Sequence, residues 1–414
     1  MTERPSDVYR AALALGVLAV ALPNQFALFV LLQPHVDFRF ALRPLSLGYG
    51  EQGIYIALGD VLLLLTFAGW LIWTMRCRLW KDVSLPPFSL FALWAVAALS
   101  VLNASGIWKS LSESIADNGF AIGSLIDATS FRGAATEMIQ WTLYFILAPI
   151  LFINLLRMQG HTGWLLRLIL LVTLISGFVA VCDIFVRDDG MPVRGLWGSL
   201  PIYIGVLAIL LPIAAARLQR GTRAKRRWLP EAVLLLGIVT IVVGVAKAGP
   251  SKFLSIYDEE GDVKKEFIEW GAGINLLTSK VPRTNLPLGV GMGNYQNNIG
   301  SYYGPLPNKG TVRNDVNSLF WVLAGSTGFI GLTAFIFTLL QFGEIARRVA
   351  RAQGGRATRA LAVGMQVAIV SIAVISPFTN ILVRGSAPLL ILLFCMLHDA
   401  DLRVSRKNKS QATL

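Results

Sequence analysis

A glycine-rich segment, 287–296, has residue types and spacing that suit a close backbone approach. It reads Pro-Leu-Gly-Val-Gly-Met-Gly-Asn-Tyr-Gln, so that Gly289, Gly291 and Gly293 alternate with larger residues and Asn294 follows directly. Because glycine has no Cβ, such a segment can run close to a ligand or to another helix, and can turn where a side chain would collide. We predict that these residues contribute to substrate binding, together with Asn317 farther along the chain.

Cationic side chains near this segment and at other ends of apolar runs suit phosphate binding. Arginine grips phosphate oxygens with two nitrogens of its planar guanidinium, whereas lysine acts as a point charge. A charge beside a membrane span is costly enough to indicate function, although long basic side chains also snorkel to lipid head groups. The residues of interest are Arg194, Lys247, Lys252, Arg283, Arg313 and Arg384.

Asp315 is the residue that we predict to act as a general base. It lies two residues after Arg313 and just before a long apolar run. Its carboxylate could accept a proton while Arg313 binds phosphate. An Asp at this place is equally suited to cap the following helix by accepting a backbone N–H of its first turn. The sequence leaves both roles open.

The elements that must position these residues are long apolar segments in a chain of 414 residues. Hydrophobic residues make up 55%, charged residues 15%, and the mean hydropathy is +0.61, which is atypical of a soluble domain. We predict an all-α, polytopic membrane helix bundle of about ten transmembrane helices, because crossing a bilayer takes roughly 20 apolar residues with satisfied backbone groups. The segments are 11–32, 53–73, 86–104, 138–156, 164–185, 196–216, 229–249, 317–340, 360–379 and 382–398.

Basic residues predict the orientation of this single membrane domain, 1–414. Short cytoplasmic loops accumulate Lys and Arg, and here such residues gather in every second loop, at 76–81, 157–167, 217–227, 347–359 and 403–409. Both termini are therefore predicted to be cytoplasmic. The long loop 250–316 is then predicted to lie outside.

The long external loop contains a predicted amphipathic helix. Its apolar residues recur at helical spacing: Val263, Phe267, Trp270, Ile274 and Leu277. Charged residues fall elsewhere around the same helix: Lys264, Lys265, Glu266 and Glu269. Such a helix either lies on the outer membrane surface or packs on neighbouring spans, and in both cases it would cover one end of the bundle.

The net charge of +13 does not indicate a nucleic-acid partner. The basic residues lie beside membrane spans, where anionic lipids as partners account for them, and no nucleic-acid-binding motif is visible. The scattered Cys77, Cys182 and Cys395 indicate neither a disulfide framework nor a metal site. The acidic run 258–262 suits a solvated turn, so we predict no metal and no cofactor.

Three motifs resemble those of the O-antigen ligase and polymerase family of bacterial polysaccharide assembly. The resemblance lies in their residues, in their order along the chain and in their places in the predicted topology. The segment 287–295 is similar to the family's Pro-Leu-Gly-Val-Gly-x-Gly-Asn-Phe. The segment 248–253 is similar to its Ser-Arg-Gly motif, with Lys252 where Arg is usual, and 59–65 is similar to its aspartate-led early span.

The resemblance implies an inner-membrane glycosyltransferase with a periplasmic site that works without a metal. Its donor would be a polyprenyl-diphosphate-linked glycan, and its acceptor a saccharide or a lipid. Other polysaccharide-assembly proteins are a further class of partner that the resemblance implies.

The chain departs from the family where acid–base chemistry is expected. Val316 precedes Asn317 where the family has His-Asn, and 325–327 stands where the family has a Glu. Asp315 or His35 would have to substitute. His161 and His398 fall on the predicted cytoplasmic side. The alternative functions are a non-catalytic subunit of a polysaccharide export system and a lipid-linked sugar flippase or transporter.

Overall fold

The fold is that of a computed structural model of the chain. It describes residues 15–16, 26–32, 37–44, 53–103, 129–159, 162–186, 200–219, 228–248, 265–278, 285–299, 302, 318–352, 355–377 and 386–412.

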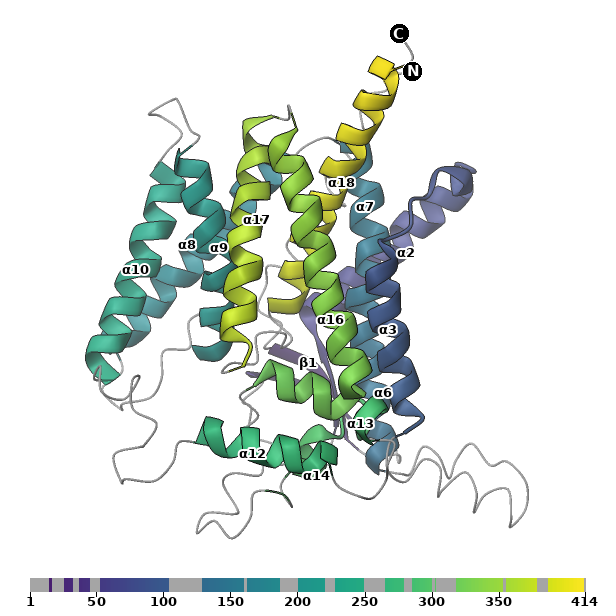
Figure 1. The fold of residues 1–414 in the computed structure, drawn as a ribbon, viewed down its shortest axis with the longest axis vertical. Helices are drawn as coiled ribbons and strands as arrows, with labels where there is room; N and C mark the ends of the chain where they lie inside the picture. Colours follow the sequence, from purple (N-terminus) through teal and green to yellow (C-terminus); the bar gives the residue numbers. More distant parts are fainter. Residues whose placement is uncertain are drawn as a thin grey trace.

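Long helices coincide with the predicted apolar segments from 53–73 onward (Figure 1). The helix α6 continues through a π-helical stretch, η2 (Leu143–Leu147), into α7, and a short 3-10 turn, η1 (Trp80–Asp82), precedes α3. The long helices are α2 (Leu58–Arg76), α3 (Phe88–Val101), α6 (Thr129–Thr142), α7 (Ala148–Gln159), α8 (Thr162–Val186), α9 (Leu200–Gln219), α10 (Trp228–Ala248), α16 (Leu319–Arg351), α17 (Arg356–Ile375) and α18 (Ser386–Ala412).

The bundle has the apolar length and surface of a membrane protein. Among the described residues, three helical stretches are long and apolar enough to cross a bilayer: Glu137–Arg157, Leu319–Arg351 and Arg356–Ile375. Large apolar side chains are exposed on the outer helix faces, where a soluble protein would expose few: Leu65, Phe178, Leu235, Phe337, Leu340 and Val374. The chain is therefore a helical membrane protein, while the count of about ten spans stays a prediction.

The first part of the chain departs from the helical pattern. The strand β1 (Phe26–Leu32) pairs antiparallel with both β2 (Asp37–Pro44) and β3 (Gly53–Ala57), which gives the order β2-β1-β3. The predicted span 11–32 thus ends in a strand, and 53–73 begins in one. Within 38–43, Phe38, Phe40 and Leu42 occupy every second position, which is the period-two pattern of a strand. Hydropathy averaged over a long window does not detect this pattern.

The two ends of the bundle differ in character (Figure 1). The upper end in Figure 1 carries the last turns of α2, α7, α9 and α16, with Arg76, Arg157, Arg217 and Arg351, and we call it the basic end. The lower end carries α12 (Lys265–Thr278), α13 (Asn285–Leu288) and α14 (Tyr295–Ile299), and we call it the motif end. The described basic helix ends and the glycine-rich segment therefore lie far apart.

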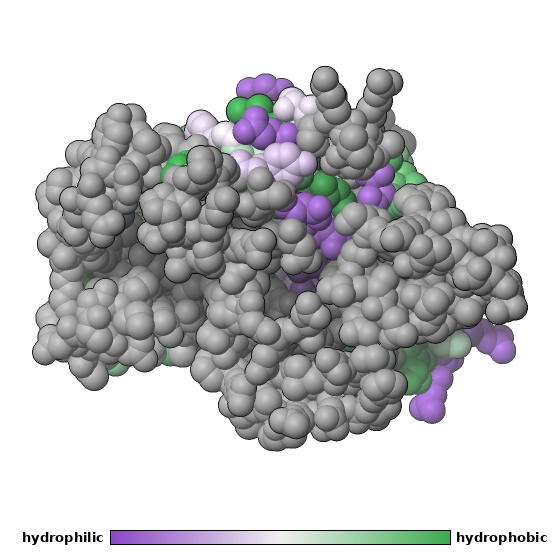
Figure 2. All heavy atoms as spheres, turned by 90° about the horizontal axis from the view of Figure 1, so that it is seen from below, coloured by the Kyte–Doolittle hydropathy of each residue, from purple (hydrophilic) through white to green (hydrophobic). Residues whose placement is uncertain are grey.

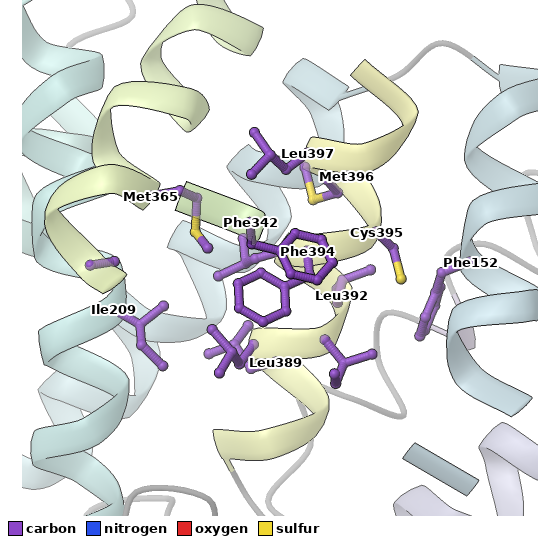
Figure 3. Close-up of a cluster of buried hydrophobic side chains, with 14 of the residues drawn as sticks. Phe152, Ile209, Phe342, Met365, Leu389, Leu392, Phe394, Cys395, Met396 and Leu397 are labelled. Atoms are coloured by element: carbon purple, nitrogen blue, oxygen red, sulfur yellow. The ribbon is translucent and has the colours of Figure 1, made fainter. Parts of the chain in front are cut away.

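The core of the bundle is built around α18, which is buried on every side between Ala387 and Leu397. A helix that is apolar all round is buried either in a protein core or in a bilayer, and here the residues from 387 to 397 are buried within the protein. The Phe394 ring stacks on Phe342 of α16, with ring centroids 3.9 Å apart and an interplanar angle of 4° (Figure 3). Met365 of α17 lies beside this pair in the same cluster (Figure 3).

The helices α9 and α17 pack closely against each other. At Gly364 of α17, an added Cβ would collide with the Cα of Ile213 in α9 and would lie 2.8 Å from the backbone nitrogen of that residue. Only glycine allows the two backbones to approach so closely. In contrast, a Cβ at Gly343 of α16 would have no neighbour within 4 Å in the described part of the chain.

Gly364→Ala is expected to destabilise the protein, because the new methyl group must push α9 away from α17. Overpacking of this kind typically costs about 1–3 kcal/mol. The measurement is the thermal unfolding midpoint of the full-length protein in detergent. Gly343→Ala is the matched control, and its midpoint should stay the same or rise because alanine favours helix. Equal midpoints for the two variants would contradict the close packing at Gly364.

Candidate functional site

The glycine-rich segment docks on a break in α16. The backbone of α16 is non-helical at Gly328, with φ 69° and ψ −175°. A continuous helix would use the carbonyls of Gly325 and Ser326 for its own i to i+4 hydrogen bonds. Here the Val290 N–H donates to the Gly325 carbonyl at 2.7 Å, and the Gly291 N–H donates to the Ser326 carbonyl at 3.1 Å. The break therefore supplies the acceptors that hold the segment.

Glycine is required on both sides of this contact. Gly289 has φ 72°, and an added Cβ would lie 2.5 Å from the Ser326 carbonyl oxygen. On the α16 side, a Cβ at Gly328 would collide with the carbonyl of Pro287. Gly291 and Gly293 also have positive φ, 95° and 73°. The sequence predicted a close approach to a ligand or to a helix, and in the structure the near partner is a helix.

A second set of hydrogen bonds ties the segment to its surroundings. The side chain of Asn103, just after α3, donates to the Gly289 carbonyl. The buried Asn294 donates its backbone N–H to the Gly291 carbonyl at 3.1 Å, and its own carbonyl accepts the Asn298 side chain at 2.8 Å. Gly289, Gly291, Gly293 and Asn294 are therefore brought together as a rigid turn.

A buried carboxylate, Glu269 of α12, lies beside this turn. The Tyr295 hydroxyl donates to Glu269 Oε1 at 3.4 Å, and the two residues are 2% and 1% exposed. The ring of Tyr295 occupies the space above Gly325, where an added Cβ would collide with it. Tyr295 thus contacts both the Glu269 carboxylate and Gly325. Gly325 belongs to 325–327 of α16, the place at which the family that the sequence resembles has a Glu.

The helix α12 exists as predicted, but it is rotated relative to the predicted apolar stripe. Glu269, placed on the charged side by the sequence analysis, is buried, whereas Ile274 of the predicted stripe is half exposed. The reason is the partner of α12. Gly273 packs against the Trp321 ring of α16, 2.8 Å from an added Cβ, and the Trp270 indole N–H donates to the Pro377 carbonyl at 3.0 Å.

The cap of α16 is Ser318. Its hydroxyl accepts the backbone N–H of Trp321 at 3.4 Å, and the backbone N–H of Leu319 donates to the Ser376 carbonyl at 2.9 Å. The capping role that the sequence left open for Asp315 therefore belongs to Ser318. The helix also begins two residues later than the predicted span 317–340.

Most of the predicted cationic residues are outside the described part of the chain. Lys247 lies in the last turn of α10, where the structure describes the backbone alone. His398 is described on α18, one residue beyond the buried stretch that ends at Leu397. The residues outside the described ranges are Arg194, Lys252, Arg283, Arg313, Asp315, Asn317 and Arg384, together with His35 and His161.

A second buried carboxylate, Asp60, lies in the first turn of α2. It accepts a 2.5 Å hydrogen bond from the Tyr144 hydroxyl, and both residues are buried. Tyr144 belongs to the π-helical stretch η2, a helix irregularity that is frequent at functional sites. An ionisable group in an apolar bundle is stable only with such a partner. Asp60, the acid of the 59–65 motif, thus links α2 to the helix formed by α6, η2 and α7.

At the motif end, hydrogen-bonding groups lie among apolar residues. Viewed from this end, the described residues form a band in which hydrophilic and hydrophobic surface are mixed (Figure 2). Within the described ranges, there is no group of three or more His, Cys, Asp or Glu residues that would hold a metal ion.

Comparisons with known proteins do not identify a family. No protein-family model matches the chain, and no curated protein matches it significantly. The resemblance to O-antigen ligases and polymerases therefore stays a prediction, and function must be inferred from the residues of the site.

Gly289→Ala is expected to detach the glycine-rich segment from α16, because the added methyl group collides with the broken turn and alanine disfavours the positive φ. The measurement is amide hydrogen exchange of 287–295, which should become faster than in the parent protein. Gly271→Ala in α12 is the control, because an added Cβ there meets no atom of the described residues within 4 Å. Unchanged exchange in Gly289→Ala would show that the docking is wrong.

Proposed function

We propose that the chain is an inner-membrane glycosyltransferase that polymerises or transfers a polyprenyl-diphosphate-linked oligosaccharide on the periplasmic side. One observation carries the proposal: a glycine-rich turn, fixed by backbone hydrogen bonds to a broken helix, lies beside the buried Glu269 at the end of a membrane bundle. A rigid turn with a carboxylate next to it is a suitable frame for group transfer.

The charge distribution supports an external position for the motif end. Arg76, Arg157, Arg217 and Arg351 lie at the basic end, and short basic segments beside spans favour the cytoplasm. The motif end, at the opposite end of the bundle, would then face outward (Figure 1).

An external site needs a substrate that carries its own activation, because nucleotide sugars and ATP are cytoplasmic. A lipid diphosphate provides a leaving group and keeps the donor in the bilayer. The acceptor hydroxyl oxygen attacks the anomeric carbon, and the bond from that carbon to the diphosphate oxygen breaks. The lipid diphosphate leaves with the electron pair, and a carboxylate takes the hydroxyl proton. Attack opposite the leaving group inverts the anomeric configuration.

The roles of the residues follow from their chemistry. Arg313 would bind the diphosphate, assisted by Arg283 or another of the predicted cations, because guanidinium binds phosphate oxygens in pairs. Asp315 or Glu269 would accept the proton. The chain lacks the Glu of the family that it resembles, but Glu269 supplies a carboxylate at the motif end. The presence of this carboxylate weakens the case for a non-catalytic subunit.

Arg313→Ala and Asp315→Asn are expected to affect different steps. The full-length protein, reconstituted in liposomes with a polyprenyl-diphosphate oligosaccharide, should release lipid diphosphate. Arg313→Ala should weaken donor binding, whereas Asp315→Asn should slow turnover with little loss of binding. A parent protein that binds the donor without ever releasing lipid diphosphate would favour the non-catalytic subunit. Movement of intact donor between the two leaflets, without release, would favour the flippase.

Glu269→Gln tests the carboxylate that the structure adds. If Glu269 is the general base, the loss of its carboxylate should lower kcat by about 10²–10⁴-fold. It should also remove the decrease of kcat towards low pH. Tyr295→Phe keeps the ring over Gly325 and removes the hydroxyl, so its effect should be smaller.

Glu344→Gln is the matched control for Glu269→Gln, because it makes the same chemical change at a half-exposed residue that is ion-paired with Arg347 on α16. It should leave turnover unchanged. If Glu269→Gln lowered the unfolding midpoint and left kcat and its pH profile intact, Glu269 would be a packing residue only.

A further inference from the structure

Arg217, in the last turn of α9 at the basic end, has an unusual environment. Its Nη1 atom is buried and has no hydrogen-bond partner among the residues that the structure describes. A buried guanidinium nitrogen without a partner is costly, because the charged group has lost water and gained nothing in return. Such a donor is satisfied when an anion occupies the space next to it.

A second positive charge acts on Arg217. The Arg167 guanidinium of α8 lies close enough to Arg217 to repel it through space. The start of α8 meets the start of α17 here, since a Cβ on Gly163 would lie 3.6 Å from the Cβ of Ala357. Two neighbouring cations repel each other unless an anion lies between them, and phosphate is the anion whose oxygens arginine binds best.

The exposed face of α8 continues from Arg167 as an apolar stripe. Leu171, Ile175 and Phe178 follow at spacings of three and four residues and are 40%, 51% and 63% exposed. These positions share one helix face. Trp164, also exposed, precedes Arg167 on this face, and tryptophan favours the level of lipid head groups.

The length of this stripe matches a lipid chain. From Arg167 to Phe178 the helix rises about 16 Å at about 1.5 Å per residue. One leaflet of a bilayer has an apolar depth of about 15 Å, half of the whole hydrocarbon core. A cation pair at the top of an apolar stripe of this length therefore fits one phospholipid.

We propose that an anionic phospholipid binds at α8 and α9, with its phosphate between Arg167 and Arg217 and an acyl chain along Leu171, Ile175 and Phe178. The charge of the site selects an anionic head group. The cytoplasmic leaflet is rich in such lipids, and basic pockets between spans bind them there. The sequence after α9 carries further basic residues, at 220–227.

The test compares lipids on the purified full-length protein by native mass spectrometry. Dioleoylphosphatidylglycerol should bind more tightly than dioleoylphosphatidylcholine. Arg167→Gln should weaken binding of the anionic lipid about fivefold, and the double variant with Arg217→Gln about 25-fold, from the usual contribution of one basic residue. Arg167 is exposed, so its single variant stays folded even if the double variant does not.

Arg347→Gln is the control, because Arg347 is an exposed arginine at the same end and is paired with Glu344 at 2.7 Å. It should leave lipid binding unchanged. Equal losses in Arg347→Gln and Arg167→Gln, or equal binding of the two lipids, would overturn the site.

The acyl chain is tested separately from the phosphate. Phe178→Ser should weaken binding of dioleoylphosphatidylglycerol and leave that of dihexanoylphosphatidylglycerol unchanged, since the short chains do not reach this residue. Inorganic phosphate should compete poorly. Competition by phosphate at the concentration of the long-chain lipid would show a site for free anions and would refute the lipid.

Discussion

The hydrogen bonds from the glycine-rich segment to the broken turn of α16 are the contact on which the motif end depends. They require two unusual backbone conformations at once, because both Gly289 in the segment and Gly328 in the helix have positive φ. The break makes the carbonyls of Gly325 and Ser326 available as acceptors, and the segment supplies the N–H groups. The partners therefore stabilise each other, and neither conformation is favourable alone.

This contact also organises the polar residues around it. Tyr295 follows the segment directly, so fixing the segment fixes its ring above Gly325 and its hydroxyl beside Glu269. Because α12 packs on Trp321 and donates a hydrogen bond to the Pro377 carbonyl, the helix that carries Glu269 is itself attached to α16 and to the chain just after α17. A carboxylate held in this way keeps its position relative to the turn, which suits chemistry at the motif end.

The bundle separates two kinds of electrostatic environment. The basic end carries arginines at helix termini, among them Arg217 with its unpartnered nitrogen. The motif end carries a carboxylate and hydrogen-bonding backbone groups within an apolar frame. An enclosed apolar helix, α18, runs between them and connects α16, α17 and α7 through one continuous core. The same long helices, α16 among them, therefore connect the two ends of the bundle.

The sequence by itself determined that the chain is a helical membrane protein with long apolar helices, and which segment can approach another group closely. Both are local properties: apolar length decides whether a helix can span a bilayer, and the absence of a Cβ is visible in the residue type. Only the tertiary structure decided that Glu269 is buried, that Ser318 is the cap and that part of 26–57 forms strands. The direction in which a helix face points depends on its partner, which is Trp321 of α16 and the Pro377 carbonyl for α12 and the broken turn of α16 for the glycine-rich segment.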